Sequence, residues 1–144
     1  MTALAAGFAR EYKDIQNAIF TEYPVEAGET IYQGGLVMLD TDGYVLAATA
    51  TASQLIVGWA DETVVNSGAD GAAKIRVRSG CTGKMAASSI TIAMIGDLME
   101  CVDDNTVDDS GSNDVKAGVL VAPYISTSQG WVFIPPYGMH TYGL

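Results

Sequence analysis

Glycine and Asp-Gly turns divide the chain into short apolar runs, and this punctuation is the feature that most limits its fold. The clearest case is Val37–Leu39, which is followed by the turn Asp40–Gly43 and by a second apolar run, Tyr44–Leu46. Asp-Gly supplies the positive φ angles that a tight hairpin turn requires. Similar turn signals continue from Val25 to Gly118. The sequence therefore predicts an all-β protein, a small β-barrel or β-sandwich.

The apolar runs between the turns give the expected strands. Their ranges are 30–33, 36–40, 44–47, 55–60, 74–79, 98–102, 115–121 and 131–134. Lys74–Arg78 alternates most cleanly, with Ile75 and Val77 expected to point inward and three cations outward. Ser88–Ile95 is ambiguous, and there we expect a short helical turn that ends at Gly96.

The two ends of the chain differ from the turn-rich region between them, so we divide it into residues 1–24, a β domain at 25–134 and a tail at 135–144. In the first segment Phe8, Tyr12, Ile15 and Ile19 recur at spacings of four, three and four, which is a helical stripe. This segment is either a short helix packed on its own domain or an arm, helical or extended, that reaches a neighbouring subunit.

Prolines mark the inner limits of both end segments. Pro24 should end any helix in residues 1–24, because the residue before proline is pushed out of the α region. Pro135 and Pro136 remove the backbone donors that a central strand needs. The tail should therefore be extended and pack against another surface.

Composition limits the classes of partner. The chain has 144 residues, 49% of them hydrophobic, so it can build one core unaided. Its 17 acidic and 7 basic residues give a net charge of −10, which argues against nucleic acid as a partner. The cations are scattered singly and no apolar run approaches about 18 residues, which argues against a membrane. The N-terminal residues lack a secretory signal pattern, so we expect a soluble product made in the cytoplasm.

Residues with catalytic or metal-binding chemistry are sparse. His140 is the only histidine, the glycine-rich phosphate-binding motifs are absent, and Cys81 and Cys101 lack metal-ligand spacing. We expect no enzyme activity and no cofactor, with both cysteines reduced. The acidic run from Asp103 to Asp114 predicts an exposed loop, and whether it binds calcium is left open because its spacing does not match a calcium-binding loop. Asp40 and Asp42 are explained by turn geometry.

Several segments, taken in order, carry a resemblance to a known family. They are TIYQGGLV at 30–37, DTDGYV at 40–45, IVGWADETVVNSGADG at 56–71, IRVRSG at 75–80, IGDLM at 95–99, VDDNTV at 102–107, AGVLV at 117–121 and GWVFI at 130–134. This ordered set resembles the capsid cement, or head decoration, proteins of tailed bacteriophages. The resemblance covers residues 25–134 and not the two ends.

The resemblance implies a non-enzymatic virion protein that lies on the outer capsid surface and is made in the host cytoplasm. It implies a partner, the major capsid protein, whose subunits the chain would bridge to stabilise the head. It also implies a homo-oligomer, with a trimer favoured over a dimer. An alternative is a carbohydrate-binding, adhesin-like β domain displayed on a particle, which could depend on calcium. A hydrolase with paired aspartates ranks third, because no motif supports it.

Aromatic and apolar residues at the unmatched ends are the candidate interface residues. Aromatic side chains dominate the energetically important positions of protein interfaces. We expect capsid or subunit contacts at Phe8, Tyr12, Ile15, Ile19, Phe20, Tyr23, Tyr137, Met139 and Tyr142. The alternative is that these residues cover the domain's own core. Trp59 and Trp131 lie in expected strands and should belong to the core.

Overall fold

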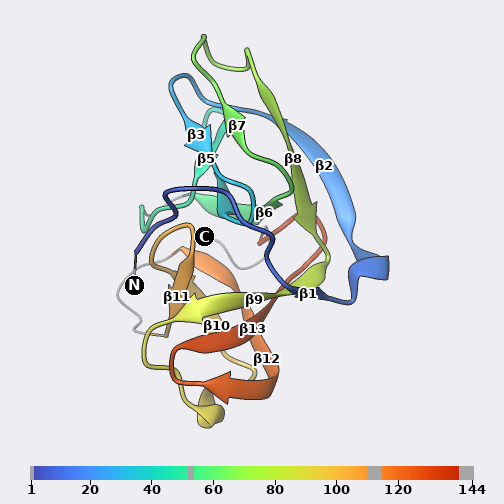
Figure 1. The fold of residues 1–144 in the computed structure, drawn as a ribbon, viewed down its shortest axis with the longest axis vertical. Helices are drawn as coiled ribbons and strands as arrows, with labels where there is room; N and C mark the ends of the chain where they lie inside the picture. Colours follow the sequence, from blue (N-terminus) through green and yellow to red (C-terminus); the bar gives the residue numbers. More distant parts are fainter. Residues whose placement is uncertain (1, 52–53, 110–114, 140–144) are drawn as a thin grey trace.

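The computed structural model describes residues 2–51, 54–109 and 115–139, and in these ranges the regular secondary structure is almost entirely β-strand (Figure 1). This confirms the predicted all-β class and the β-barrel architecture. The strands are β1 Tyr12–Lys13, β2 Ile19–Pro24, β3 Thr30–Ile31, β4 Leu36–Leu39, β5 Val45–Ala47, β6 Leu55–Ala60, β7 Val64–Val65, β8 Lys74–Ser79, β9 Cys81–Ala87, β10 Leu98–Cys101, β11 Thr106–Asp108, β12 Lys116–Ser126 and β13 Gln129–Ile134. Two 3-10 turns, Ile15–Asn17 and Ile92–Met94, are the helical elements of these ranges.

One sheet closes on itself. Its strand order is β1-β9-β11-β10-β12-β13, and β9 pairs with β13 as well. The ring β9-β11-β10-β12-β13 is therefore a closed barrel, called here the lower barrel because it forms the lower half of Figure 1. The pair of β9 and β11 is parallel, while the other pairs of the ring are antiparallel.

The second sheet has the order β2-β8-β6-β4-β5 and forms the upper half of Figure 1. It is called here the upper sheet. All its neighbours are antiparallel, and a bridge between Val25 and Val45 brings its two outer strands together at one end. The short ribbon of β3 and β7 accompanies it. The upper sheet is thus curled around its own apolar interior.

Strands β4 and β6 form a wall shared by two hydrophobic cores. Leu36, Met38 and Trp59 belong to the larger core with the apolar residues of the lower barrel. Val37 and Val57 lie in the smaller core inside the upper sheet. Successive residues of a strand point to opposite faces, so a strand buried on both faces reads as a continuous apolar run. The two halves of the molecule are therefore joined through buried side chains.

A bulge in β6 sets which side chains reach each core. The register between β4 and β6 shifts next to Gly58, which has a φ of 151°. Ile56 and Trp59 are three residues apart, yet both lie in the larger core. A Cβ at position 58 would collide with the carbonyl oxygen of Arg78 on β8. Glycine is therefore needed at position 58, where the β6 backbone leaves no room for a Cβ beside β8.

The predicted hairpin and most predicted strands are present. Asp40 and Tyr44 are joined by a backbone hydrogen bond of 2.8 Å across the turn, which connects β4 to β5. Strands β6 and β8 have the predicted bounds. The predicted helical turn within Ser88–Ile95 is the 3-10 turn Ile92–Met94. The sequence prediction missed β1, β2, β7, β9 and β11.

The helix considered for residues 1–24 does not form, and that alternative is wrong. The segment contains β1, a 3-10 turn and β2, and β2 pairs with β8 from Ile19 to Pro24. The apolar residues with four-three-four spacing do not share one helical face, because Tyr12 belongs to one sheet while Ile19 belongs to the other. Pro24 ends a strand instead of a helix.

The described part of the tail packs on the domain itself. The Tyr137 N–H donates to the Ser79 hydroxyl at 2.8 Å, and the Met139 N–H donates to the Ile56 carbonyl at 2.8 Å. Met139 is buried in the larger core. Residues 140–144, with His140 and the candidate Tyr142, lie outside the described ranges. In the described ranges no helix is long and apolar enough to cross a membrane.

Candidate interaction surface

Aromatic rings and arginines alternate from the larger core to the surface beside β2 and β8. The buried Trp59 meets Tyr12 edge-to-face, with ring centroids 5.5 Å apart. The Arg78 guanidinium lies 4.2 Å from the Tyr12 ring centroid and 5.0 Å from that of Phe20. Arg76 lies 5.2 Å from Phe20 on its exposed side. These residues form a cation–aromatic ladder, the name used for them below.

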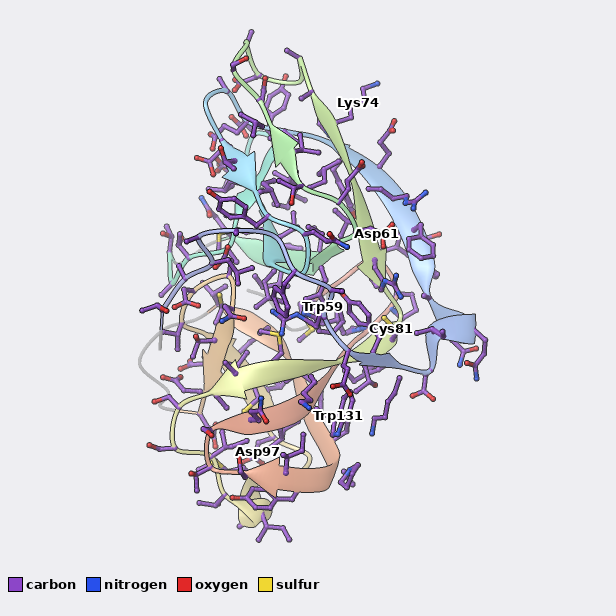
Figure 2. All side chains as sticks on the ribbon, in the orientation of Figure 1. Trp59, Asp61, Lys74, Cys81, Asp97 and Trp131 are labelled. Carbon is purple, nitrogen blue, oxygen red and sulfur yellow. The ribbon has the colours of Figure 1, made fainter. Side chains whose placement is uncertain are left out.

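Strand register brings the ladder together. Arg78 on β8 lies opposite Phe20 on β2 and, on its other side, opposite Trp59 on β6. Residues directly opposite each other in neighbouring strands point to the same face of a sheet. Strand β1 then places Tyr12 over this face, because it pairs with β9 of the other sheet at Gly83. Figure 2 shows Trp59 where the upper sheet and the lower barrel meet.

Asp61 holds both arginines of the ladder. Its carboxylate accepts hydrogen bonds from Arg76 at 2.5 Å and from Arg78 at 3.0 Å, and its side chain is 14% exposed. Burial alone would raise the pKa of Asp61, but the bonds and charges of the two arginines outweigh burial and lower that pKa. Burial raises the pKa of Tyr12 to about 12, so its ring is neutral beside Arg78. The carboxylate of Asp61 therefore holds both arginines of the ladder in place.

The candidate interface residues have different environments. Tyr12 and Phe20 are both in the ladder. Phe8 lines a small pocket together with Tyr12 and Arg78, and the Arg10 guanidinium lies 4.7 Å from its ring. Ile15 is 59% exposed and Tyr137 is 53% exposed. Ile19 and Tyr23 are half-buried on the opposite face of β2 from Phe20. Met139 faces its own core, which was the alternative left open for these residues.

Sequence reasoning missed the charged members of the ladder. Arg76 and Arg78 were expected only as outward cations on a strand, and Asp61 was not singled out. The available signal was the choice of arginine, because a planar guanidinium stacks on aromatic rings and binds a carboxylate with two nitrogens. Trp131, expected in the core, is half-buried and has the Lys13 ammonium 4.4 Å from its ring.

Arg10 links the segment before β4 to strand β9 of the lower barrel. It is 7% exposed, and it donates from Nε to the Gly34 carbonyl at 2.6 Å and from Nη1 to the Lys84 carbonyl at 2.6 Å. Its Nη2 donates to Asn105 Oδ1 at 2.9 Å. Burial lowers the pKa of Arg10 to about 10. A cavity of about 490 Å³ lies beside it, between the N-terminal segment and β9.

The acidic run is only partly the exposed loop that was expected. Asp104 is buried and its Oδ1 accepts the Leu4 N–H at 2.9 Å, while Asp103 Oδ1 accepts the Asn105 N–H at 2.8 Å. Thr106–Asp108 is strand β11 of the lower barrel. Positions 110–114 lie outside the described ranges.

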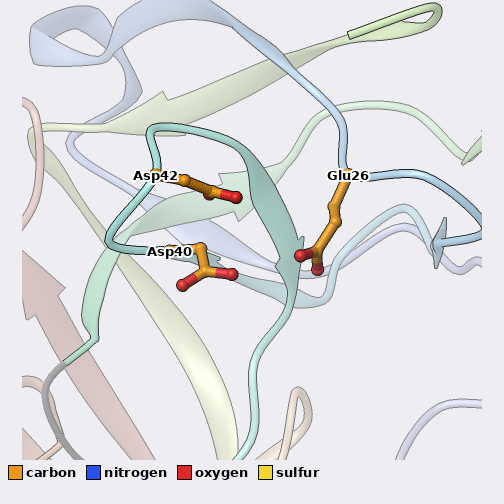
Figure 3. A group of neighbouring side chains, drawn as sticks. All are labelled: Glu26, Asp40 and Asp42. Atoms are coloured by element: carbon orange, nitrogen blue, oxygen red, sulfur yellow. The ribbon is translucent and has the colours of Figure 1, made fainter. Parts of the chain in front are cut away.

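A different carboxylate group could hold a cation. Glu26, Asp40 and Asp42 each offer an oxygen, and these oxygens lie within 4.8 Å of one another. Figure 3 shows Glu26 directed toward the two aspartates of the β4–β5 hairpin. Burial, followed by the hydrogen bond and negative charge of Asp40, raises the pKa of Glu26. Among the described residues this is the group whose geometry suits a metal ion.

The chain matches no protein-family model and no curated protein.

Proposed function

We propose that this chain is a non-enzymatic virion structural protein that binds the outer surface of a phage capsid and bridges major capsid protein subunits. The cation–aromatic ladder is the observation that carries the proposal. Phe20 is 47% exposed and lies against Arg76, whose side chain is 60% exposed. Aromatic residues and arginine are the types that contribute most binding energy at protein interfaces. The resemblance of the ordered sequence segments at 30–134 to those of decoration proteins supports the choice of the capsid as the partner.

The proposed binding mode uses a rigid surface. Asp61 fixes the arginines and β8 fixes Phe20, so little side-chain entropy is lost when a partner binds. Copies of the chain acting as a homo-oligomer would add avidity on a symmetric shell. Binding to the assembled shell then stabilises it by mass action. The protein would be made in the host cytoplasm and act on the outside of the virion.

Co-sedimentation with undecorated, expanded heads of the encoding phage tests the proposal. The full chain should pellet with the heads at a fixed stoichiometry. The double substitution Phe20→Ala and Arg76→Ala should weaken binding by about tenfold or more, since each residue is of a type that dominates interfaces. Ile92→Ala is the matched control, because Ile92 is 68% exposed and lies on the 3-10 turn Ile92–Met94, outside the ladder. Full-length chain that stays in the supernatant at saturating heads would refute the proposal.

The alternative is a carbohydrate-binding, adhesin-like domain that depends on calcium. The specific observation in its favour is the carboxylate group of Glu26, Asp40 and Asp42, since calcium is bound by several oxygen ligands. A glycan array in calcium and in chelator tests it. Glycan binding that chelator abolishes, and that Asp40→Asn also abolishes, would favour this function over capsid binding.

A further inference from the structure

Strand β2 has an open edge. It pairs with β8 on one side and forms the outermost strand at the right of Figure 1. Along Ile19–Tyr23 the described residues provide no strand on its other side. An open edge presents a row of backbone donors and acceptors to any incoming strand.

The hydrogen-bond pattern identifies which backbone groups are open. The Val25 N–H donates to Ala73, which precedes β8, so Val25 is bonded toward the β8 side. In an antiparallel pair this direction alternates, and Thr21 and Tyr23 therefore also face β8 while Phe20 and Glu22 face away. The Glu26 N–H confirms the alternation, because it donates to Val45 of β5 on the far side. The edge is closed by β5 at Glu26 and open at Phe20 and Glu22.

The open stretch has only one of the usual protections of an edge strand, the charge of Glu22. Native edges are guarded by charges, prolines or bulges. Between Ile19 and Tyr23 the residues are strong strand formers apart from Glu22, and Pro24 comes only where the edge begins to close. Ile19 and Tyr23 are also only half-buried, although they share the inward-directed face of β2.

Charge favours a second copy of this chain as the occupant. Segments 10–24, 61–62 and 74–84 are linked by strand pairing and by the ion pairs of Asp61. They hold six of the seven cations and five of the 17 acids, a net charge of +1 against −11 for the rest of the chain. Two copies that meet at β2 bring these near-neutral sides together and keep their acidic sides apart.

We propose that two copies associate through β2, antiparallel about a two-fold axis that passes beside Thr21. In this register Phe20 of each copy lies opposite Glu22 of the other, and each of these residues exchanges both backbone hydrogen bonds with its counterpart. All four outward N–H groups are then satisfied. The missing N–H of Pro24 costs nothing, because Pro24 lies beyond the paired stretch.

The side chains suit the same register. Ile19 lies opposite Tyr23 of the second copy, so each copy covers the half-buried apolar pair of the other. The two Thr21 side chains are neighbours, which is a favourable pair in sheets. Glu22 lies opposite Phe20 and not opposite a second carboxylate, so no like charges face each other directly. The contact is isologous, as a two-fold axis requires.

This pairing needs no capsid and goes beyond the proposed function. It assigns a dimer, the less favoured of the two oligomers that the sequence resemblance implies. The test of the dimer uses the chain alone. Dimer formation can therefore fail while capsid binding succeeds, and capsid binding can fail while the dimer forms.

Sedimentation velocity of the full chain over a range of concentrations tests the dimer. The wild type should approach twice the 15.1 kDa mass of one chain as concentration rises. Glu22→Pro removes an outward donor while keeping the bonds to β8, and it should stay monomeric with an unchanged circular dichroism spectrum. Glu22→Gln keeps the backbone donor and should dimerise as the wild type does. Dimerisation of Glu22→Pro with the affinity of the wild type would overturn the proposal.

A cysteine at the two-fold axis tests the register. Thr21→Cys should form a disulfide-linked dimer under mild oxidation, because Cα atoms of a non-hydrogen-bonded antiparallel pair lie about 4.5 Å apart. Phe20→Cys should not cross-link with itself, but should cross-link with Glu22→Cys when the two are mixed. A wild-type chain that stays monomeric at all concentrations would overturn self-pairing. If the wild type is monomeric and Glu22→Pro loses capsid binding, the edge of β2 binds the capsid protein instead.

Discussion

Asp61 is the residue on which both arginines of the ladder converge. Its side chain is mostly buried, and it accepts from Arg76 and Arg78. Arg76 is well exposed, so its bond to Asp61 contributes little, whereas the bond from the less exposed Arg78 is worth more. Removing the carboxylate charge would leave Arg78 beside two aromatic rings without its counter-ion.

Replacing Asp61 should therefore change both stability and its dependence on pH. Asp61→Asn should lower the free energy of unfolding at pH 7 by roughly 1–2 kcal/mol. Because the pKa of Asp61 is lowered in the folded state, its stabilisation is present above the unfolded-state pKa and is lost as pH falls through the folded-state pKa. The difference in free energy of unfolding between wild type and variant should therefore shrink as the pH is lowered below about 5. Urea unfolding at each pH measures it.

Ile92→Ala is the control for this experiment. Ile92 is 68% exposed, lies outside the ladder and carries no titratable group. Its difference in stability from the wild type should therefore be the same at every pH. A difference between wild type and Asp61→Asn that stays constant down to pH 2 would contradict the role assigned to Asp61.

At the scale of elements, the bulge of β6 decides which core receives each side chain. Gly58→Ala should destabilise the protein by about 2–4 kcal/mol, because the added Cβ meets the Arg78 backbone, which cannot move without shifting β8. Gly43→Ala is the control: Gly43 also has a positive φ, 94°, but its Cβ would project into open space. It should cost only about 1–2 kcal/mol. Equal urea midpoints for the two variants would show that a Cβ at position 58 does not collide with the backbone of β8.

Strand signals in the sequence predicted the elements that have apolar runs and turns beside them. Strands β6 and β8 are examples, and the β4–β5 hairpin has its Asp-Gly turn. Strand β9 was missed because Cys81–Ala87 reads CTGKMAA, which holds residues of weak strand propensity. It is a strand because β13 pairs with it along its length, which is a tertiary effect.

Only the aromatic residues of the cation–aromatic ladder could be predicted from the sequence. Tyr12 and Phe20 were selected as candidate interface residues, and both belong to the ladder. Their position next to Arg78 depends on the register of β2 against β8 and of β1 against β9. No local pattern encodes these pairings, because the paired residues lie at least 50 positions apart. Helical spacing in residues 1–24 even pointed to the wrong element.

At the scale of the whole molecule, the shared wall of β4 and β6 couples the two halves. Leu36 and Met38 belong to one core and Val37 to the other, so neither core can open without disturbing the same strand. Arg10 adds hydrogen bonds to Gly34 above and Lys84 below. The molecule should therefore unfold as one cooperative unit.

The two cysteines report on this cooperativity. Cys81 and Cys101 are buried thiols of the larger core, and burial raises their pKa to about 11 and about 12. Both should react with a thiol reagent at pH 8 only when the protein unfolds, since the thiolate is the reactive form. In a urea series, the midpoint of thiol labelling should coincide with the midpoint of far-UV circular dichroism, which monitors both sheets. Thr41→Cys, at the exposed hairpin turn, should label at once in native protein and serves as the control. Thiol labelling that is complete before the dichroism changes would show that the lower barrel opens independently of the upper sheet.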